Sequence, residues 1–165
     1  MTAEFEELTT DLYEQPGHLI RRAQQIAVSM FHSVIGTHVT PVQYAVLRIL
    51  QDHPNIDQNT LASLCALDTS NTAALAIRLE ERGLIERVVR ESNKRYRVLR
   101  LTDAGSNLLM ELVPAVHTLH RKMLGTLDLD EQRQFMALLK KFVNLNNEQS
   151  RAPFRQRTGS DQGGE

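Results

Sequence analysis

The chain of 165 residues is poor in aromatic residues, cysteine and net charge. Aromatic residues make up 5% and Trp is absent, whereas 41% of residues are apolar, so Leu, Ala and Val must fill the core, as they do in helical proteins. The single cysteine, Cys65, excludes an internal disulfide and suits a reducing compartment. The net charge of −1 provides no general attraction for nucleic acid, so any basic surface must be local.

The sequence also lacks the patterns of membrane proteins and enzymes. Residues 1–15 carry five acidic groups, no basic ones and no apolar stretch, unlike a secretory signal. No run of about eighteen apolar residues is present. We find no glycine-rich phosphate loop, nucleophile elbow, metal quartet or catalytic carboxylate pair. We therefore expect a cytoplasmic protein without enzymatic activity or cofactor.

Helical periodicity and capping residues predict four helices in the first half of the chain. The first begins at Pro16 and closes near Gly36. The second has Thr40 as its cap, a short third follows within residues 57–68, and the fourth starts at Asp68 or Thr69. This fourth helix ends at Gly83, the residue type that best adopts the left-handed turn after a helix.

After Gly83 the hydrophobic period changes from that of a helix to that of a strand. Residues 84–89 and 96–101 alternate as strands do, and the polar residues 90–95 separate them, which predicts a β-hairpin. Thr102 and Asp103 then cap a fifth helix, and an Asp128 to Glu131 capping box opens a sixth. Residues 148–165 are polar and contain glycine, which predicts a disordered tail.

Three helices followed by a two-stranded wing predict a winged helix-turn-helix, a mainly α fold with a small β-hairpin. We assign residues 39–102 to this DNA-binding domain and residues 1–15 to an acidic arm. Residues 16–38 and 103–147 form a helical dimerisation region. Its apolar stripes, within residues 19–34, 109–123 and 135–142 (Phe135, Leu139, Phe142), exceed what one small domain can cover, and such seams are more often subunit interfaces than cofactor boxes.

The predicted hairpin concentrates positive charge. Residues 87–100 hold six basic side chains against Glu91 alone. Contact with DNA phosphates needs such a concentration, because each neutralised phosphate releases condensed counterions. The alternative is an ordinary solvated hairpin whose charges alternate with core residues.

Three segments carry a family resemblance: VTPVQYAVL at residues 39–47, residues 61–87, and NKRYRVLRLTDAG at residues 93–105. Together they resemble the MarR family of bacterial ligand-responsive transcriptional regulators, over residues 16 to about 147. The resemblance implies a homodimer in which the first, fifth and sixth helices pack across a two-fold axis and each winged module binds half of a pseudopalindromic operator in double-stranded DNA.

The fourth helix is the predicted recognition helix, with Leu75 and Leu79 facing the core. Its opposite arc carries the candidate DNA-binding residues Thr69, Ser70, Asn71, Ala73, Ala74 and Arg78. Asn71 can pair bidentately with adenine, and the methyl groups of Ala73 and Ala74 suit thymine methyls. Ala74 stands where family members often carry arginine, which weakens guanine readout and favours an A·T-rich operator.

In the wing, Arg95 matches the family arginine that enters the minor groove, where a narrow A·T tract concentrates negative potential. Asn93 replaces the acidic residue that usually braces this arginine. Lys94 and Arg97 are candidate phosphate contacts. The alternative for Arg97 is an exposed strand residue that bridges to Glu86.

One face of the first helix predicts an effector site. His18, Arg22, Ser29 and His32 share this face with Gln25, opposite the apolar stripe. An arginine fork with histidines and a hydroxyl can hold a carboxylate, although a solvated helix face has the same spacing. Tyr44 and Arg48 are candidates for the facing wall, and Arg48 is equally suited to a surface ion pair. The segment QPGHLIRRAQQIAVSMF at residues 15–31 also resembles regulators of aromatic-acid degradation, which implies benzoates, hydroxycinnamates or their CoA thioesters as effectors.

A histidine pair and the single cysteine raise two further possibilities, a metal site and a redox sensor. His117 and His120 are spaced as half a zinc site, and we expect no metal there. Cys65 lies among leucines on a short helix, where we expect a protonated, inert thiol. We therefore predict a dimeric repressor released by an aromatic carboxylic acid or its CoA thioester; the alternatives are a winged-helix protein-interaction module and a redox-responsive regulator acting through Cys65.

Overall fold

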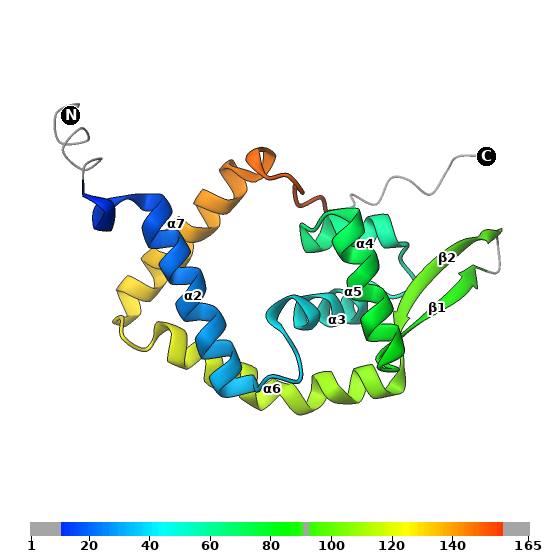
Figure 1. Ribbon diagram of the computed structural model, residues 1–165. Helices are drawn as coiled ribbons and strands as arrows, with labels where there is room; N and C mark the ends of the chain where they lie inside the picture. The colour runs from blue at the N-terminus through cyan, green and yellow to red at the C-terminus, as the bar shows by residue number, and fades with distance from the viewer. Residues whose placement is uncertain (1–10, 91–92, 157–165) are drawn as a thin grey trace.

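The computed structural model describes residues 11–90 and 93–156, and the side chains of residues 90 and 93–96 lie outside this description. The helices are α2 (Pro16–Ile35), α3 (Pro41–Asp52), α4 (Gln58–Cys65), α5 (Thr69–Glu81), α6 (Asp103–Leu124) and α7 (Leu129–Leu145), with the 3-10 turns η1 (Leu12–Glu14) and η2 (Asn147–Gln149). Strands β1 (Ile85–Arg90) and β2 (Asn93–Leu101) form one antiparallel hairpin (Figure 1). The predicted mainly α fold with a wing is confirmed. Among the described residues, no helix has the length and apolarity to cross a bilayer.

Local chemistry places the helix ends where the sequence predicts them. Thr40 and Gln43 form a capping box at the start of α3, because each side chain bonds the other residue's backbone N–H, at 3.2 and 3.0 Å. Asp68 caps α5. Gly36 and Gly83 follow α2 and α5 with φ values of 91° and 67°, which suit residues without a Cβ.

The wing is longer than the sequence pattern indicated. Strands β1 and β2 include four of the six residues that the polar spacing assigned to the connection, and the register shifts between Val89 and Arg90. Strand β2 also bonds the loop before α4, with the Leu99 N–H donating to the Ile56 carbonyl at 2.8 Å. The added residues of β2 lie at its start, where Asn93 pairs with Arg90 of β1 beyond the register shift, and side-chain alternation does not predict this pairing. The loop at Ile56 carries no strand periodicity that would predict its bond to Leu99.

Two apolar clusters meet on α6. Leu109 belongs to the core of the winged module, together with Leu47 and Leu79. Leu112, Val116 and Leu119 pack with other members of a second cluster on α2, at residues 31 and 35. We expected the seam at residues 109–123 to serve as subunit interface, but its buried part is covered within the chain because α2 lies along α6.

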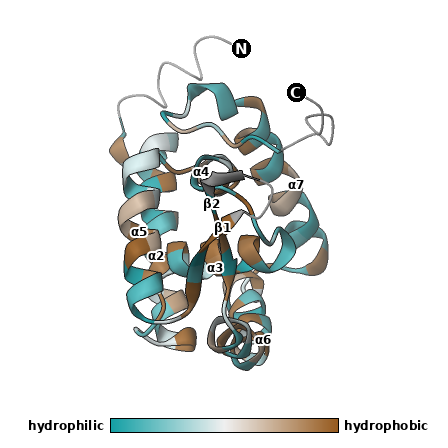
Figure 2. Cartoon of the chain, turned by 90° about the vertical axis from the view of Figure 1, so that its right-hand side faces the viewer, coloured by the Kyte–Doolittle hydropathy of each residue, from teal (hydrophilic) through white to brown (hydrophobic). Residues whose placement is uncertain are grey.

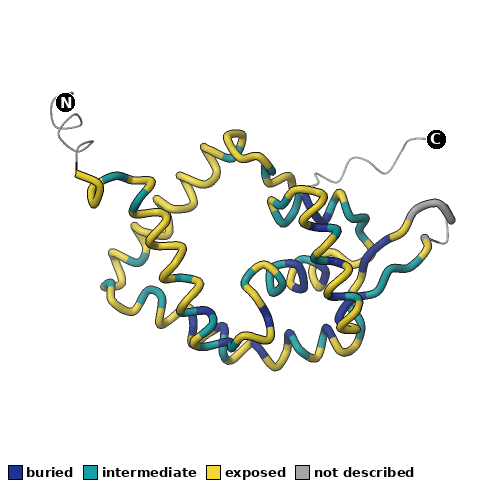
Figure 3. Tube along the Cα trace, viewed as in Figure 1, coloured by how far each residue is buried: buried dark blue, intermediate teal, exposed yellow. Residues whose placement is uncertain are grey.

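A different surface is left uncovered. No residue of α7 is buried, and Phe135, Leu139 and Phe142 are 46%, 44% and 51% exposed. The first half of α2 is similar, with Leu19 and Ile20 exposed at 46% and 50%. Figure 3 shows α7 and the first half of α2 almost entirely as exposed tube, and Figure 2 shows hydrophobic residues recurring along α7. These faces are apolar surface that the described chain does not cover.

Hydrogen bonds hold the first part of the predicted disordered tail against the rest of the chain. The amide of Asn147 bonds the backbone N–H and carbonyl of Phe154, at 2.8 and 3.1 Å. The next backbone N–H, of Arg155, donates to the Ser63 carbonyl in α4 at 3.1 Å. The structure therefore differs from the expectation over residues 148–156, which run from α7 back to α4 (Figure 1), whereas residues 157–165 lie outside the described part.

Replacing Asn147 with alanine removes both side-chain bonds to Phe154. We expect the bonds that hold residues 148–156 against the chain to be weakened by about 1 kcal/mol. This corresponds to a roughly fivefold larger fraction of molecules in which this segment is detached. We expect trypsin to cleave after Arg151 and Arg155 about fivefold faster, measured by mass spectrometry under native conditions. Asn146→Ala is the matched control, because the Asn146 amide bonds only the last turn of α7, at the Phe142 carbonyl. Equal cleavage of the two variants would contradict this role of Asn147.

Candidate nucleic-acid interface and ligand site

Helix α5 separates into a buried face and an exposed face. Ala76 and Leu79 are fully buried in the core, and Leu75 packs against it. Thr72 is also fully buried, and its hydroxyl donates to the Asp68 carbonyl at 2.8 Å, which satisfies the one buried polar side chain of this helix. The opposite face of α5 is therefore presented as one rigid surface.

The predicted DNA-binding residues of α5 share this opposite face. The exposed ones are Thr69, Ser70, Asn71, Ala74 and Arg78, and Ala73 is half-buried. Ile77, which the sequence reasoning missed, is 46% exposed. Its spacing of three and four residues from Ala74 and Ala73 places it with them on the helix surface, and this spacing was available as a signal. The three form a small apolar patch that suits thymine methyl groups.

Asp68 organises the first turn of α5. Its Oδ1 accepts from the backbone N–H of Asn71 at 2.8 Å and from the Ser70 hydroxyl at 3.0 Å. Its Oδ2 accepts from Nδ2 of Asn71 at 2.5 Å. The bond from the Asn71 backbone is the largest of the causes that lower the pKa of the Asp68 carboxyl below its usual value. The Asn71 amide nitrogen is thus engaged in the chain without DNA.

The wing carries less free positive charge than the residue count indicates. Arg100 pairs with Glu86 across the strands at 2.7 Å, and Arg87 pairs with Glu80 of α5 at 3.2 Å. The alternative for Arg97, a bridge to Glu86, is therefore not the pairing observed; Arg97 lies opposite Val89 and is exposed. The side chains of Lys94 and Arg95 lie outside the described residues, so their DNA contacts stay predictions.

A groove of about 430 Å³ lies between α3 and α6. Tyr44, Arg48 and Gln51 line it from α3. Arg48 also forms an exposed ion pair with Asp52 at 3.2 Å, the alternative that the sequence left open. Such exposed pairs are weak, so this pair leaves Arg48 able to exchange Asp52 for a ligand carboxylate.

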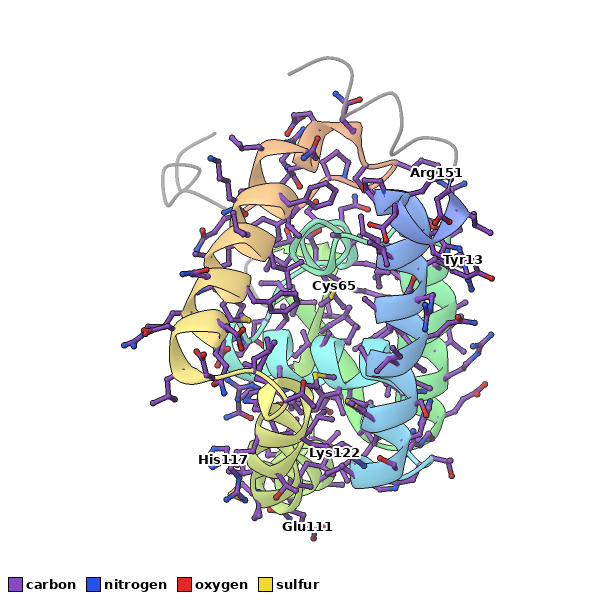
Figure 4. All side chains as sticks on the ribbon, turned by 90° about the vertical axis from the view of Figure 1, so that its left-hand side faces the viewer. Tyr13, Cys65, Glu111, His117, Lys122 and Arg151 are labelled. Carbon is purple, nitrogen blue, oxygen red and sulfur yellow. The ribbon has the colours of Figure 1, made fainter. Side chains whose placement is uncertain are left out.

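The α6 wall of this groove was missed by the sequence reasoning. It includes Ser106, Met110, His117 and His120, and His117 projects outward from α6 in Figure 4. These residues, with Val113, follow one another at spacings of four and three, which places them on one face of the helix. This spacing could have predicted the groove wall, whereas the sequence reasoning considered His117 and His120 only as a pair of metal ligands. Within the described ranges, no group of three or more His, Cys, Asp or Glu is placed to hold a metal ion.

The four candidate ligand residues on α2 do not line this groove. His18 packs edge-on against Tyr13, and His32 Nδ1 lies 3.1 Å from the Gly36 carbonyl. Arg22 and Ser29 are exposed. Helix α2 is joined to α6 by a bond from Lys122 to the Ser33 hydroxyl at 2.9 Å (Figure 4). The structure therefore brings Tyr44 and Arg48 together, but not with the polar face of α2.

Comparison with known sequences matches residues 39–96 to the model of the MarR family. Transcriptional regulator HosA of Escherichia coli O127:H6 is 34% identical over 106 residues, which cover 64% of this chain and 78% of HosA. The chain belongs to the MarR family. The homoprotocatechuate degradative operon repressor of Escherichia coli is 28% identical over 128 residues, which cover 76% of this chain and 86% of that protein.

Solved structures of MarR-type regulators share the fold. PcaV of Streptomyces coelicolor, solved with its natural ligand, has a TM-score of 0.76 and 34% identity, covering 81% of this chain and 95% of PcaV. BpsR of Bordetella bronchiseptica, whose DNA binding is regulated by 6-hydroxynicotinic acid, has a TM-score of 0.74 and 29% identity, covering 79% and 94%. The repressor CouR, solved on a 23-mer DNA duplex, has a TM-score of 0.73 and 29% identity, covering 80% and 94%.

Cys65 ends α4 in this MarR-family protein and lies near the centre of the view in Figure 4. The side chain is half-buried, and burial raises the pKa of its thiol to about 11. Because the thiolate is the nucleophile, this burial makes the thiol unreactive at neutral pH.

The pKa of about 11, against an ordinary value of 9.0, predicts slow alkylation of the folded protein. At pH 8 a two-unit rise reduces the thiolate fraction by about a hundredfold, so we expect iodoacetamide to modify Cys65 about a hundredfold more slowly than in the denatured chain. The rate should climb as pH rises toward 11. Equal rates in the folded and denatured protein at pH 8 would refute the raised pKa and reopen the redox alternative.

Proposed function

We propose that this MarR-family regulator is a homodimeric repressor whose winged modules bind operator DNA and are released by an aromatic carboxylic acid or its CoA thioester. The observation that carries the proposal is the exposed face of α5 beside the basic hairpin, in a chain whose net charge is −1. Relatives that repress aromatic catabolism, and one that is regulated by 6-hydroxynicotinic acid, support the effector class.

DNA binding follows from the arrangement of helix and wing. Helix α5 enters the major groove with its capped N-terminal turn, and the wing extends along the neighbouring backbone or minor groove. The apolar patch of Ala73, Ala74 and Ile77 favours thymine, while the exposed arginines Arg78 and Arg97 supply phosphate contacts. CouR on its duplex supports this docking for the fold.

Dimerisation covers the apolar faces that the single chain leaves open. The exposed apolar residues of α7 and of the first half of α2 are too many for a soluble monomer. A two-fold axis pairs the same patch on each subunit and sets the distance between the two α5 helices. An operator with two half-sites is then bound only when this distance matches one helical turn of DNA.

The groove between α3 and α6 is the preferred effector site. Arg48 offers the bidentate fork that a carboxylate needs, and Tyr44, Met110 and Val113 provide surface for an aromatic ring. A ligand releases DNA only if it binds more tightly to the conformation with mis-spaced α5 helices. The polar face of α2, with Arg22, is the second candidate, because a partner subunit packed against α2 can complete a pocket there.

The role is regulatory rather than enzymatic, as in the relatives named above, and we place it in the cytoplasm with the DNA. The raised pKa of the Cys65 thiol disfavours the redox alternative. A protein-interaction module without a DNA role is distinguished by salt, because phosphate contacts force a steep loss of affinity as salt rises.

The first test is fluorescence anisotropy with the purified chain and its own upstream intergenic DNA at several salt concentrations. We expect tight binding, and we expect Arg97→Ala to reduce the slope of log K against log salt by about 0.9, one phosphate's share. Arg133→Ala, on α7, is the control and should leave the slope unchanged. Absent or salt-insensitive binding by the unmodified chain would contradict the regulator proposal.

The second test adds benzoates, hydroxycinnamates and their CoA thioesters to the complex. Arg48→Ala should leave DNA affinity intact and raise the effector concentration for half-release about tenfold, because a charge-assisted bidentate contact is lost. Asp52→Asn removes the competing partner of Arg48 and should leave release as strong or stronger. If Arg22→Ala abolishes release while Arg48→Ala does not, the site lies on α2 instead. Release by none of these compounds would contradict the effector class.

A further inference from the structure

The first turn of α5 presents side chains whose polar atoms are already oriented by one carboxylate. Asp68 accepts the Ser70 hydroxyl on Oδ1 and the Asn71 amide on Oδ2, while Oδ1 also caps the helix through the Asn71 backbone N–H. All three residues are exposed on the face of α5 that carries the proposed DNA contacts. These bonds therefore decide which atoms meet a base edge.

The orientation of the Asn71 amide follows from the chemistry of its partner. An ionised carboxylate has acceptors only, so the atom of Asn71 that lies 2.5 Å from Oδ2 must be the amide nitrogen. Turning the amide over would set Oδ1 of Asn71 against a charged oxygen and lose this bond. An aspartate is ionised at neutral pH, and the backbone bond from Asn71 lowers the pKa of Asp68 further below its usual value. Asn71 is thus held with its nitrogen toward Asp68 and its oxygen turned away from it.

We infer that Asp68 is a positioning residue for base specificity, which holds Asn71 so that its carbonyl oxygen is the atom presented to the major groove. The inference rests on the proposed DNA-binding function. An acceptor in the groove selects bases that offer an amino group, adenine through N6 or cytosine through N4, and disfavours the carbonyl edges of guanine and thymine. Ser70 also presents an acceptor to the groove, because its hydroxyl hydrogen is donated to Asp68 in a hydrogen bond and its oxygen lone pairs remain free to accept.

The N-cap of α4 shows that capping alone does not need this arrangement. Asp57 accepts the backbone N–H groups of Asn59 and Thr60 on Oδ1, at 3.0 Å each, and its Oδ2 takes the Thr60 hydroxyl at 2.7 Å. Asp57 therefore caps α4, a neighbouring helix of the winged module, without bonding a side-chain amide. Asp57→Asn changes charge and cap chemistry as Asp68→Asn does, which makes it a matched control.

The decisive variant is Asp68→Asn. Asparagine caps helices about as well as aspartate, so its oxygen stays on the Asn71 backbone N–H, and its amide nitrogen takes the place of Oδ2. A donor now faces Asn71, whose amide turns over and presents its nitrogen to the groove. We expect the preference at one base pair of each half-site to shift about tenfold, away from adenine or cytosine and toward guanine or thymine on the contacted strand.

The chain of 165 residues and its variants are tested in parallel on a library of randomised duplexes, and then by competition with the four base pairs at each position of the selected site. Asn71→Ala identifies the base pair that Asn71 reads, and Asp68→Asn in the Asn71→Ala background should have no further effect there. Asp57→Asn should leave every preference unchanged. Asp68→Ser, which caps the helix but offers nothing to the amide, should flatten the preference, and circular dichroism confirms that each variant is folded.

The outcomes separate the inference from the function on which it rests. A shift with Asp68→Asn at the base pair lost in Asn71→Ala supports it. Unchanged preferences in both folded Asp68 variants, or no base pair affected by Asn71→Ala, overturn it while salt-dependent DNA binding still stands. Failure of the unmodified chain to select any duplex overturns the proposed function itself.

Discussion

Helix α6 is shared by two apolar cores, and the placement of every functional surface depends on this sharing. In the first half of α6, Leu109 completes the core of the winged module; about one turn later, Leu112 begins the cluster with α2. Tyr44 of α3 packs against both clusters. Because close-packed interiors shift between discrete packings rather than deform continuously, α5 and α2 are mechanically linked through α6.

The groove between α3 and α6 is lined by this shared helix. In the proposed function, a ligand held there by Arg48 contacts the shared helix directly, so its binding energy biases the spacing of the two α5 helices without a long chain of intermediate contacts. The segment after α7 adds a second connection, because it bonds α4, which precedes the recognition helix. The surfaces proposed for DNA recognition are the exposed face of α5 and a hairpin whose charge is partly neutralised by Glu80 and Glu86.

Features governed by neighbours along the chain were predictable. The caps at Thr40, Asp68 and Asp128 and the glycine ends of α2 and α5 lie where the sequence indicated, because capping bonds join residues two or three positions apart. Two predictions were wrong: the length of β2, and the surface that covers the apolar seam of α6. The seam depends on α2, a partner distant in sequence, and the added residues of β2 pair with β1 only beyond a register shift that side-chain alternation does not predict. An apolar stripe shows that a helix face must be covered, but not by which helix.

The sequence by itself determined the mainly α fold, the winged module, the exposed arc of α5 and the membership of the family, since these follow from periodicity, capping and motif. Only the tertiary structure decided that Arg48 lines a groove with His117 rather than with Arg22, and that Arg100 rather than Arg97 pairs with Glu86. It also decided that the Asn71 amide is held by Asp68. Side-chain partners are selected by rotamer and by the packing of distant elements, and neither is encoded in residue type and spacing alone.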